Sequence, residues 1–195
     1  ELCESVPSVT MNKSDAVNDR KVSEDEARAV LETLDRYHYA SIRHVWFLLA
    51  WRTSARISSL RALDVEDYDR DEQCLTYQQR DNTKLKNGPS GARPVALSNE
   101  TCAIIDDYLR HQTDQHGREP FFSSAHGRVH RNTMRRWCYT LTCPSFRGEA
   151  CETDKCRSQQ DGKTAHACAE SVSPHAVRRG SITYFLRQDM PEEMV

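Results

Sequence analysis

Residues 173–181 read Ser173-Pro174-His175-Ala176-Val177-Arg178-Arg179-Gly180-Ser181, a run that combines a helix start with two functional groups. A serine followed by a proline is typical of the N-cap and the first position of a helix. In such a helix His175 and Arg178 are three residues apart and project from the same face. An imidazole beside a guanidinium suits a phosphodiester, whose negative charge rises during phosphoryl transfer.

A second stretch, Thr53-Ser54-Ala55-Arg56-Ile57-Ser58-Ser59-Leu60, sets an arginine among small residues at a further helix start, which we expect at Ser54. Between the two stretches, residues 84–91 are rich in turn formers and predict a hairpin. A lysine at its tip can reach into a groove and protonate a leaving oxygen. Lys86 lies closer to the turn than Lys84. Each feature alone is also typical of a solvated surface, and only their joint presence favours a phosphate site.

The apolar pattern predicts an α+β domain that is mostly helical. A capping box at Ser23 and Glu26 begins an amphipathic helix over residues 24–37. Residues 42–51 are apolar on nearly every face, which is typical of a buried central helix. Strands over residues 74–77 and 93–97 would form a small antiparallel β-sheet of two or three strands. Further helices are predicted over residues 99–112, over residues 132–141, and from Ser173 onward with Val177, Ile182, Phe185 and Leu186 facing inward.

Composition limits the class of protein. The chain has 195 residues, 37% of them hydrophobic and 29% charged, which fits one domain with an appendage. No stretch approaches the roughly 18–20 apolar residues of a membrane span, so a soluble protein is expected. The net charge of −2 conceals a basic region, because residues 117–187 hold 12 Lys and Arg against 6 Asp and Glu. A solvated helix face and a phosphate-binding surface explain this charge equally well.

Residues 143–170 contain turn formers and four cysteines, but almost no aliphatic side chains, and predict an irregular loop. The cysteines are Cys143, Cys151, Cys156 and Cys168. Three interpretations stay open: reduced, unliganded thiols, a zinc ion that closes the loop, and disulfides. Three other cysteines lie among apolar residues and are expected in the core, namely Cys74, Cys102 and Cys138.

The order of Arg56, a lysine hairpin and the His175/Arg178 pair resembles the catalytic domain of the tyrosine recombinase (phage integrase) family. Residues 53–69 are similar to that family's first arginine box, the hairpin that ends in residues 93–97 to its lysine hairpin, and residues 173–183 to its second box. Archaeal integrases are the most similar in character, because of the cysteine-bearing loop. The resemblance implies a catalytic core over residues 23–195, preceded by a linker or tail over residues 1–22.

The resemblance implies a site-specific recombinase that breaks and rejoins double-stranded DNA through a phosphotyrosine intermediate, with no cofactor for catalysis. Arg56 and Arg178 would clamp the scissile phosphate. His175 would serve as general acid/base and phosphate ligand, and Lys86 as the hairpin lysine. Further DNA contacts are expected from Arg131, Arg135, Arg136 and Arg179.

The chain departs from the family pattern after Arg178, because the family's nucleophilic tyrosine follows at a greater distance. Neither Tyr184 nor Tyr139 fits that position. The missing initiator methionine indicates a fragment, and because no residue matches the nucleophile we expect it to be incomplete at its C-terminus and, alone, inactive and monomeric. The whole protein would be a homo-tetramer on DNA, nucleoid-associated in a prokaryotic cytoplasm. The alternative is a non-catalytic, metal-stapled DNA-binding module that uses its arginines for phosphate contacts alone.

Overall fold

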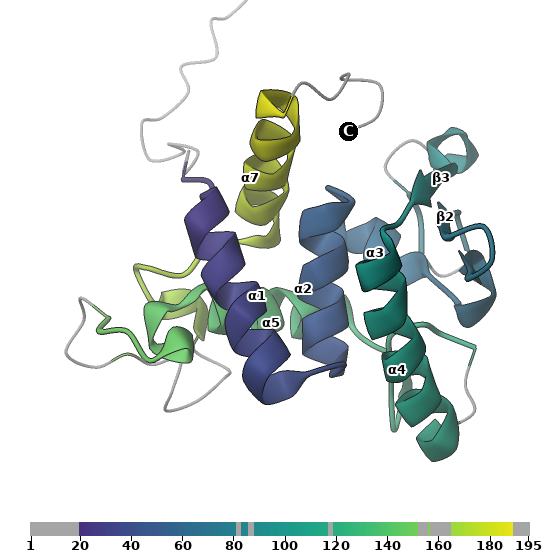
Figure 1. Ribbon diagram of the computed structural model, residues 1–195, viewed down its shortest axis with the longest axis horizontal. Helices are drawn as coiled ribbons and strands as arrows, with labels where there is room; N and C mark the ends of the chain where they lie inside the picture. The colour runs from purple at the N-terminus through teal and green to yellow at the C-terminus, as the bar shows by residue number, and fades with distance from the viewer. Residues whose placement is uncertain are drawn as a thin grey trace, which may run out of the picture.

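The computed structural model describes residues 20–80, 83–85, 88–116, 119–151, 156 and 165–188 (Figure 1). The helices in this part of the chain are α1 (Glu24–His38), α2 (Ile42–Arg52), α3 (Ile57–Ala62), α4 (Asn99–His116), α5 (Arg131–Thr142) and α7 (Pro174–Arg187). Single turns of 3₁₀-helix are η2 (Val65–Asp67), η3 (Gly88–Gly91), η4 (Pro144–Arg147) and η5 (Ala165–Ala167). None of the described helices is both long enough and apolar enough to cross a bilayer.

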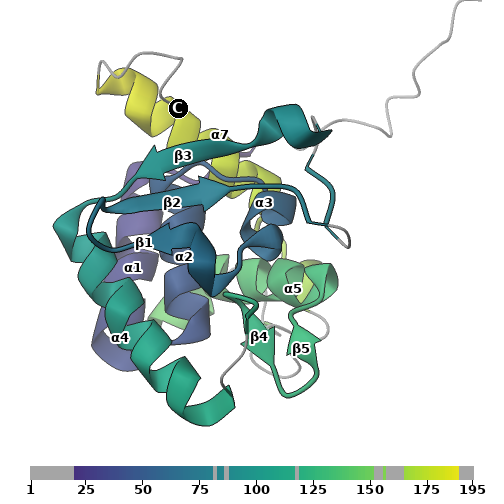
Figure 2. The ribbon, with the colours of Figure 1, turned by 90° about the vertical axis from the view of Figure 1, so that its right-hand side faces the viewer.

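The strands form two small antiparallel sheets. Strands β1 (Tyr68–Asp69), β2 (Cys74–Tyr77) and β3 (Arg93–Ala96) are neighbours in that order, and β4 (Ser123–Ser124) pairs with β5 (Gly127–Arg128). Figure 2 shows the three-stranded sheet on one side of the helices, beside α3. The α+β class with a small antiparallel sheet, expected from the sequence, is confirmed.

Helix α2 forms the centre of the core. Every side chain from His44 to Trp51 is buried. Helices α1, α3, α4 and α7 all contact α2, and Figure 1 shows α1 beside it. A helix that is apolar on all faces is unfavourable in contact with water, so other elements must cover it on every side. The predicted central helix is therefore confirmed, and it fixes the elements at its two ends.

The sheet is tied to the end of α2 by a buried hydrogen bond. Tyr77 on β2 is 1% exposed, and its hydroxyl lies 2.7 Å from Thr53 Oγ1. Thr53 Oγ1 donates to the Leu49 carbonyl at 2.7 Å, so the Tyr77 hydroxyl is the donor to Thr53. The turn that leads from α2 into α3 is thus held from the sheet side, immediately before Arg56.

A charged network anchors the connection from α3 to the sheet. Arg80 pairs with Asp64 at 3.1 Å and with the buried Asp67 at 2.8 Å. Arg128 on β5 pairs with Asp64 as well, and donates to the Leu63 carbonyl at 2.9 Å. Each buried carboxylate therefore has a cation and a hydrogen bond, the arrangement that makes burial of charge tolerable.

Residues 20–22, the end of the predicted linker or tail, lie along α7. Val22 is 4% exposed, and its N–H donates to the Ala176 carbonyl at 3.3 Å. The Arg179 guanidinium donates to the Arg20 carbonyl at 2.9 Å. Gly180 faces the same segment, where a Cβ atom would collide with the Val22 carbonyl oxygen. Helix α7 is therefore fixed on its outer side by close backbone packing.

Three expectations about local structure are wrong. Helix α3 begins at Ile57 rather than at Ser54, because Ser54 has a left-handed backbone (φ 50°) that a helix does not accept. Leu186, expected to face inward, is 39% exposed, since α7 extends beyond the helices that cover its earlier turns. Cys74 is half-buried instead of buried, because its strand has the core on one face only.

We expect Gly180→Ala to destabilise the chain by roughly 1–3 kcal/mol, because the added methyl group overpacks a rigid backbone contact. The higher helix propensity of alanine offsets only part of this cost. Urea denaturation monitored by circular dichroism measures the change in the free energy of unfolding. Gln188→Ala, at the exposed end of α7, is the control and should change stability little. A Gly180→Ala chain as stable as the parent would contradict the packing argument.

Candidate functional site: an arginine-lined cleft

Three helices meet at a cleft of about 490 Å³ that is lined by cations. Helix α3 contributes Arg56 at its N-cap, and the first turns of α7 contribute His175 and Arg178. Arg131 and Arg135 reach the cleft from α5. Residues from three distant parts of the sequence therefore share one concave surface, as the joint pattern of Arg56, His175 and Arg178 predicts.

The position of Arg178 is set by the turn after α2. Its guanidinium donates to the backbone carbonyl of Ser54. Ser54 is 1% exposed and has a left-handed backbone conformation that costs a non-glycine residue about 1 kcal/mol or more. Its hydroxyl lies 2.6 Å from that of Ser181, which in turn donates to the Trp51 carbonyl. These contacts hold Ser54 in a strained shape that directs its carbonyl toward Arg178.

The cations of the cleft repel one another. Burial, then the charges of Arg56 and Arg93, lower the pKa of Arg178 to about 10. Arg178 still carries its charge at neutral pH, so the protein keeps a partly buried cation close to two others. A bound anion would relieve this repulsion and could accept hydrogen bonds in a fork-like arrangement. Arg93 on β3 was not predicted as a site residue, because the only indication in the sequence is its position at the end of the hairpin.

His175 lies in the first turn of α7 and is exposed to solvent, so its ring can contact a ligand in the cleft directly. Ser173 and Pro174 occupy the N-cap and first position, as predicted. Tyr184, further along α7, packs with its ring 5.8 Å from that of Trp51. Of the tyrosines in the described residues, none lines the cleft.

A second hollow of about 480 Å³ continues the basic surface along α5. Arg135 lines both hollows, and Arg136 lines the second. The ring of His166, on η5, meets that of Tyr139 edge-on at 6.3 Å. Arg131, Arg135 and Arg136 are all exposed, so α5 presents a row of guanidinium groups from one hollow to the next.

Solved structures with a similar fold include site-specific recombinases and integrases. XerA recombinase superposes with a TM-score of 0.64 at 20% identity, over 93% of this chain and 54% of that one. XerH, bound to its difH substrate in a post-cleavage complex, gives 0.62 at 13% identity over 95% and 47% of the two chains. The Tn1549 transposon integrase, in complex with transposon right-end DNA, gives 0.60 at 16% identity over 91% and 56%.

This chain has the fold of a tyrosine recombinase catalytic domain. It spans about half the length of the solved structures named above. No protein-family model matches the sequence, and no curated protein is similar to it in sequence. The resemblance expected from the arginine boxes is therefore confirmed by the recombinase fold.

Among the residues considered for the site or for DNA contacts, Arg179 and Lys84 do not join the cleft of this recombinase fold, and Arg136 lines only the second hollow. Arg179 is turned away from it and donates to the Arg20 carbonyl, because adjacent residues of a helix point in different directions. Lys84 is exposed on the β2–β3 connection and is not among the cleft residues. Lys86 lies outside the described residues, so its role as the hairpin lysine stays a prediction.

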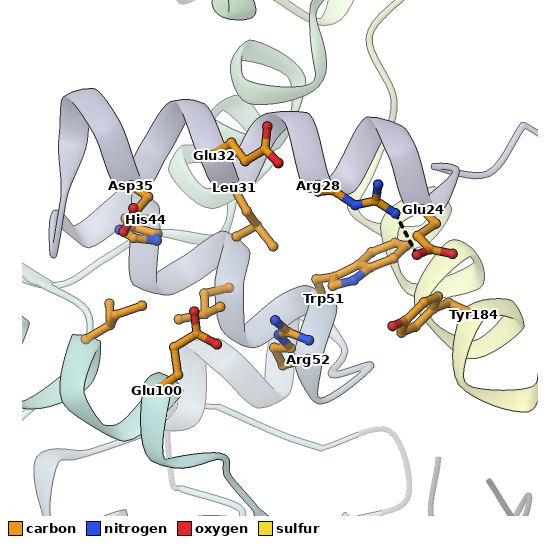
Figure 3. A pocket seen from close by; sticks show the side chains of 12 residues that line it. Glu24, Arg28, Leu31, Glu32, Asp35, His44, Trp51, Arg52, Glu100 and Tyr184 are labelled. Carbon is orange, nitrogen blue, oxygen red and sulfur yellow. Dashed lines mark hydrogen bonds and ion pairs between the residues drawn. The ribbon is translucent and has the colours of Figure 1, made fainter. Parts of the chain in front are cut away.

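A third hollow, of about 280 Å³, differs from the cleft in charge. It lies among α1, α2, α4 and α7 and is lined by four carboxylates, by Arg28, Arg52 and His44, and by apolar side chains (Figure 3); the carboxylates are those of Glu24, Glu32, Asp35 and Glu100. Arg28 is paired with Glu24 at 2.8 Å. The carboxylates make this hollow unsuitable for a phosphate, so the arginine-lined cleft is the candidate anion site of the recombinase fold.

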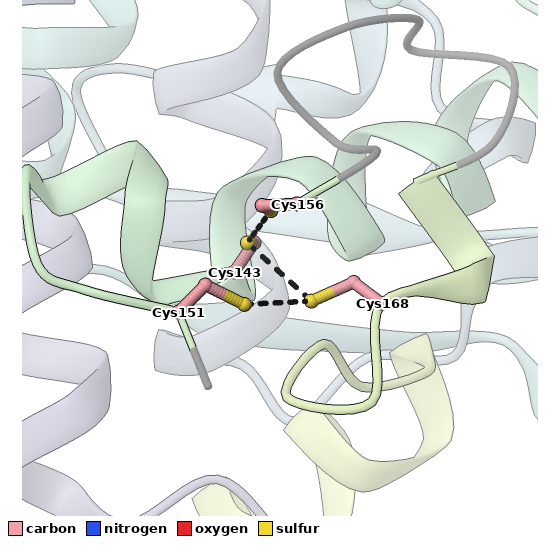
Figure 4. A group of neighbouring side chains, drawn as sticks. All are labelled: Cys143, Cys151, Cys156 and Cys168. Carbon is pink, nitrogen blue, oxygen red and sulfur yellow. Dashed lines mark hydrogen bonds between the residues drawn. The ribbon is translucent and has the colours of Figure 1, made fainter. Parts of the chain in front are cut away.

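The loop between α5 and α7 brings four sulfur atoms together (Figure 4). The Sγ atoms of Cys143, Cys151, Cys156 and Cys168 all lie within 4.8 Å of one another, a group that could hold a metal ion. Cys102 and Cys138 are buried elsewhere in the recombinase fold, as predicted, and burial raises the pKa of the Cys138 thiol above its usual range.

We expect a divalent anion to stabilise the chain through this cleft, since a ligand that binds only the folded state raises its melting temperature. Inorganic phosphate should raise Tm more than sodium chloride does at the same ionic strength. Arg56→Ala should reduce that extra gain, whereas Arg110→Ala, an exposed arginine on α4, should not. Differential scanning fluorimetry measures the shifts. An equal phosphate response in all three proteins would remove the support for an anion site.

Proposed function

We propose that this chain is the catalytic core of a site-specific DNA recombinase, which breaks and rejoins DNA through a phosphotyrosine intermediate. The observation that carries the proposal is the meeting of Arg56, His175 and Arg178 in one cleft. A surface that only bound DNA would need no such convergence. The similar structures of XerH and the Tn1549 integrase were solved with DNA, which supports duplex DNA as the partner.

In the proposed reaction Arg56 and Arg178 hold the non-bridging oxygens of the scissile phosphate and stabilise the charge that builds there. The tyrosine oxygen bonds to phosphorus and gives up its proton, while the departing sugar oxygen takes one up. His175 is exposed at the cleft and serves as phosphate ligand and proton carrier. Lys86 is the proposed donor to the departing oxygen. No cofactor takes part.

The nucleophilic tyrosine is proposed to lie outside residues 1–195 in the whole protein. Tyr184 packs on Trp51, and the other described tyrosines lie away from the cleft. Residues 23–195 are then the catalytic core, without activity alone. We propose that the whole protein works as a homo-tetramer on DNA, in a prokaryotic cytoplasm.

A second candidate function is a DNA-binding module without catalysis. The row of arginines on α5 supports it, because contacts to phosphates alone give sequence-independent affinity. The two candidates differ in what Arg178 does. A recombinase needs Arg178 for chemistry, whereas a binding module needs it no more than any other arginine of the surface.

Arg178→Ala in the whole protein should lower covalent attachment to a nicked duplex by about 10²-fold or more, the typical cost of one transition-state donor. Non-specific binding to intact duplex should fall only slightly. Denaturing gels of trapped complexes measure attachment, and gel shifts measure binding. Arg110→Ala is the matched control and should retain both. Attachment that persists in Arg178→Ala, or a parent protein that never attaches, would favour the binding module.

Arg131→Ala, Arg135→Ala and Arg136→Ala should each weaken binding to every duplex sequence alike. Each should also reduce the slope of log affinity against log salt by about one, because each removes one phosphate contact. Fluorescence anisotropy at several salt concentrations measures both quantities. Arg28→Ala, on α1 and paired with Glu24, is the control. An unchanged slope in all three variants would show that α5 does not face DNA.

A further inference from the structure

We propose that Cys143, Cys151, Cys156 and Cys168 bind one zinc ion, which fixes the segment between α5 and α7. The ion is structural, and its chemistry is separate from strand breakage. Zinc binding at the four cysteines therefore does not depend on the recombinase proposal. It would hold the loop in the domain by coordination.

The distances among the four sulfurs match a single tetrahedral ion. Cys143 Sγ lies 3.1 Å from Cys156 Sγ and 3.5 Å from Cys168 Sγ, and Cys151 Sγ lies 3.5 Å from Cys168 Sγ. No pair exceeds 4.8 Å. Zinc–sulfur bonds of about 2.3 Å in a tetrahedron separate the sulfurs by about 3.8 Å. The separations of the cluster bracket this value, and its side chains converge from separate parts of the loop (Figure 4).

Other interpretations of the cluster fit less well. The four thiols are not joined to one another by disulfides, and Cys143 is close to both Cys156 and Cys168 rather than to one partner. Disulfides would divide the cluster into two pairs at about 2.05 Å. A multinuclear iron–sulfur cluster carries its own sulfides between the cysteines and requires a wider cage. A single ion uses all four sulfurs on equal terms.

Polar groups around the cluster suit charged sulfur ligands. Ser145 Oγ lies 2.9 Å from Cys143 Sγ and 3.2 Å from Cys156 Sγ, where a hydroxyl can donate to a thiolate. Ser171 Oγ donates to the carbonyl of Cys168 at 3.0 Å and so fixes the backbone of that residue. Hydrogen bonds of this kind orient metal ligands and support the negative charge of a thiolate site.

The loop is poor in aliphatic side chains. Residues 143–170 contain no valine, leucine, isoleucine or methionine. Yet Cys143 is fully buried and Cys168 is 6% exposed, so the cysteines occupy the place of a small core. Beyond them, the Val172 N–H donates to Thr142 Oγ1 at 3.0 Å, which joins the end of α5 to the approach to α7. An ion at the cluster would fix both sides of this junction, whose Val172 is one residue before the N-cap of the helix that carries His175.

Metal analysis of the purified 195-residue chain tests the proposal directly. We expect about one zinc per chain after dialysis against metal-free buffer, since a four-thiolate site binds zinc tightly. Replacement by cobalt should give the d–d and sulfur-to-metal charge-transfer bands of tetrahedral thiolate coordination. Iron in place of zinc, no bound metal, or a mass that is lower by the hydrogens of two disulfides would each overturn the proposal.

Variants test which residues hold the ion. Cys168→Ser should lose the zinc and the cobalt bands, because a serine hydroxyl is a poor zinc ligand. Cys74→Ser is the matched control, since Cys74 is half-buried on β2 and outside the cluster. It should retain one zinc per chain. Full zinc retention by Cys168→Ser, or loss by Cys74→Ser with an unchanged fold, would assign the metal elsewhere.

Hydrogen exchange tests the structural role. Removal of zinc by a chelator should increase amide exchange in residues 165–178, which join the cluster to the first turn of α7. Residues 45–51 at the centre of α2 should change least, because they are packed on every side. Unchanged exchange in residues 165–178 after confirmed loss of the metal would overturn the structural role.

Discussion

The contact on which the site depends is the hydrogen bond from Arg178 to the carbonyl of Ser54. It joins α7 to the turn after α2, so it sets the two arginine boxes beside each other. The turn is held by three further groups: the Ser181 hydroxyl, the Trp51 carbonyl, and Thr53, which is bonded to Tyr77 of the sheet. All these groups are buried, where a lost partner is costly and the alternatives are few. The geometry of the cleft is therefore a consequence of the core.

The cleft holds its cations at a cost in stability. Burial and the neighbouring Arg56 and Arg93 lower the pKa of Arg178, which means that its charge is less favourable there than in water. By contrast, the partly buried Arg80 is paired with the carboxylates of Asp64 and Asp67. None of the described residues that line the cleft carries a carboxylate. This contrast within one domain is the physical argument for an anionic ligand.

The sequence was sufficient for most elements but not for the details that build the site. An unbroken apolar run predicts α2, because that helix is buried on all faces. Short runs of strand-forming residues predict β2 and β3. The resemblance predicts that Arg56, His175 and Arg178 meet. It could not predict the left-handed backbone of Ser54, since that conformation is normally the preserve of glycine or asparagine and is imposed here by distant contacts. The role of Arg93 depends likewise on a strand register that local sequence does not specify.

Arg178 and Arg179 show how one helix serves two purposes. Adjacent positions on a helix differ by about 100° in direction, so only one of two neighbouring arginines can face the cleft. Arg178 does so, while Arg179 donates to the Arg20 carbonyl and Gly180 allows Val22 to approach the helix backbone. Helix α7 is thus fastened on its outer side by the segment before α1, and on its inner side by the turn after α2. Because both sides are constrained, α7 cannot rotate to exchange one arginine for the other, and the orientation of the cleft follows from packing on the opposite face.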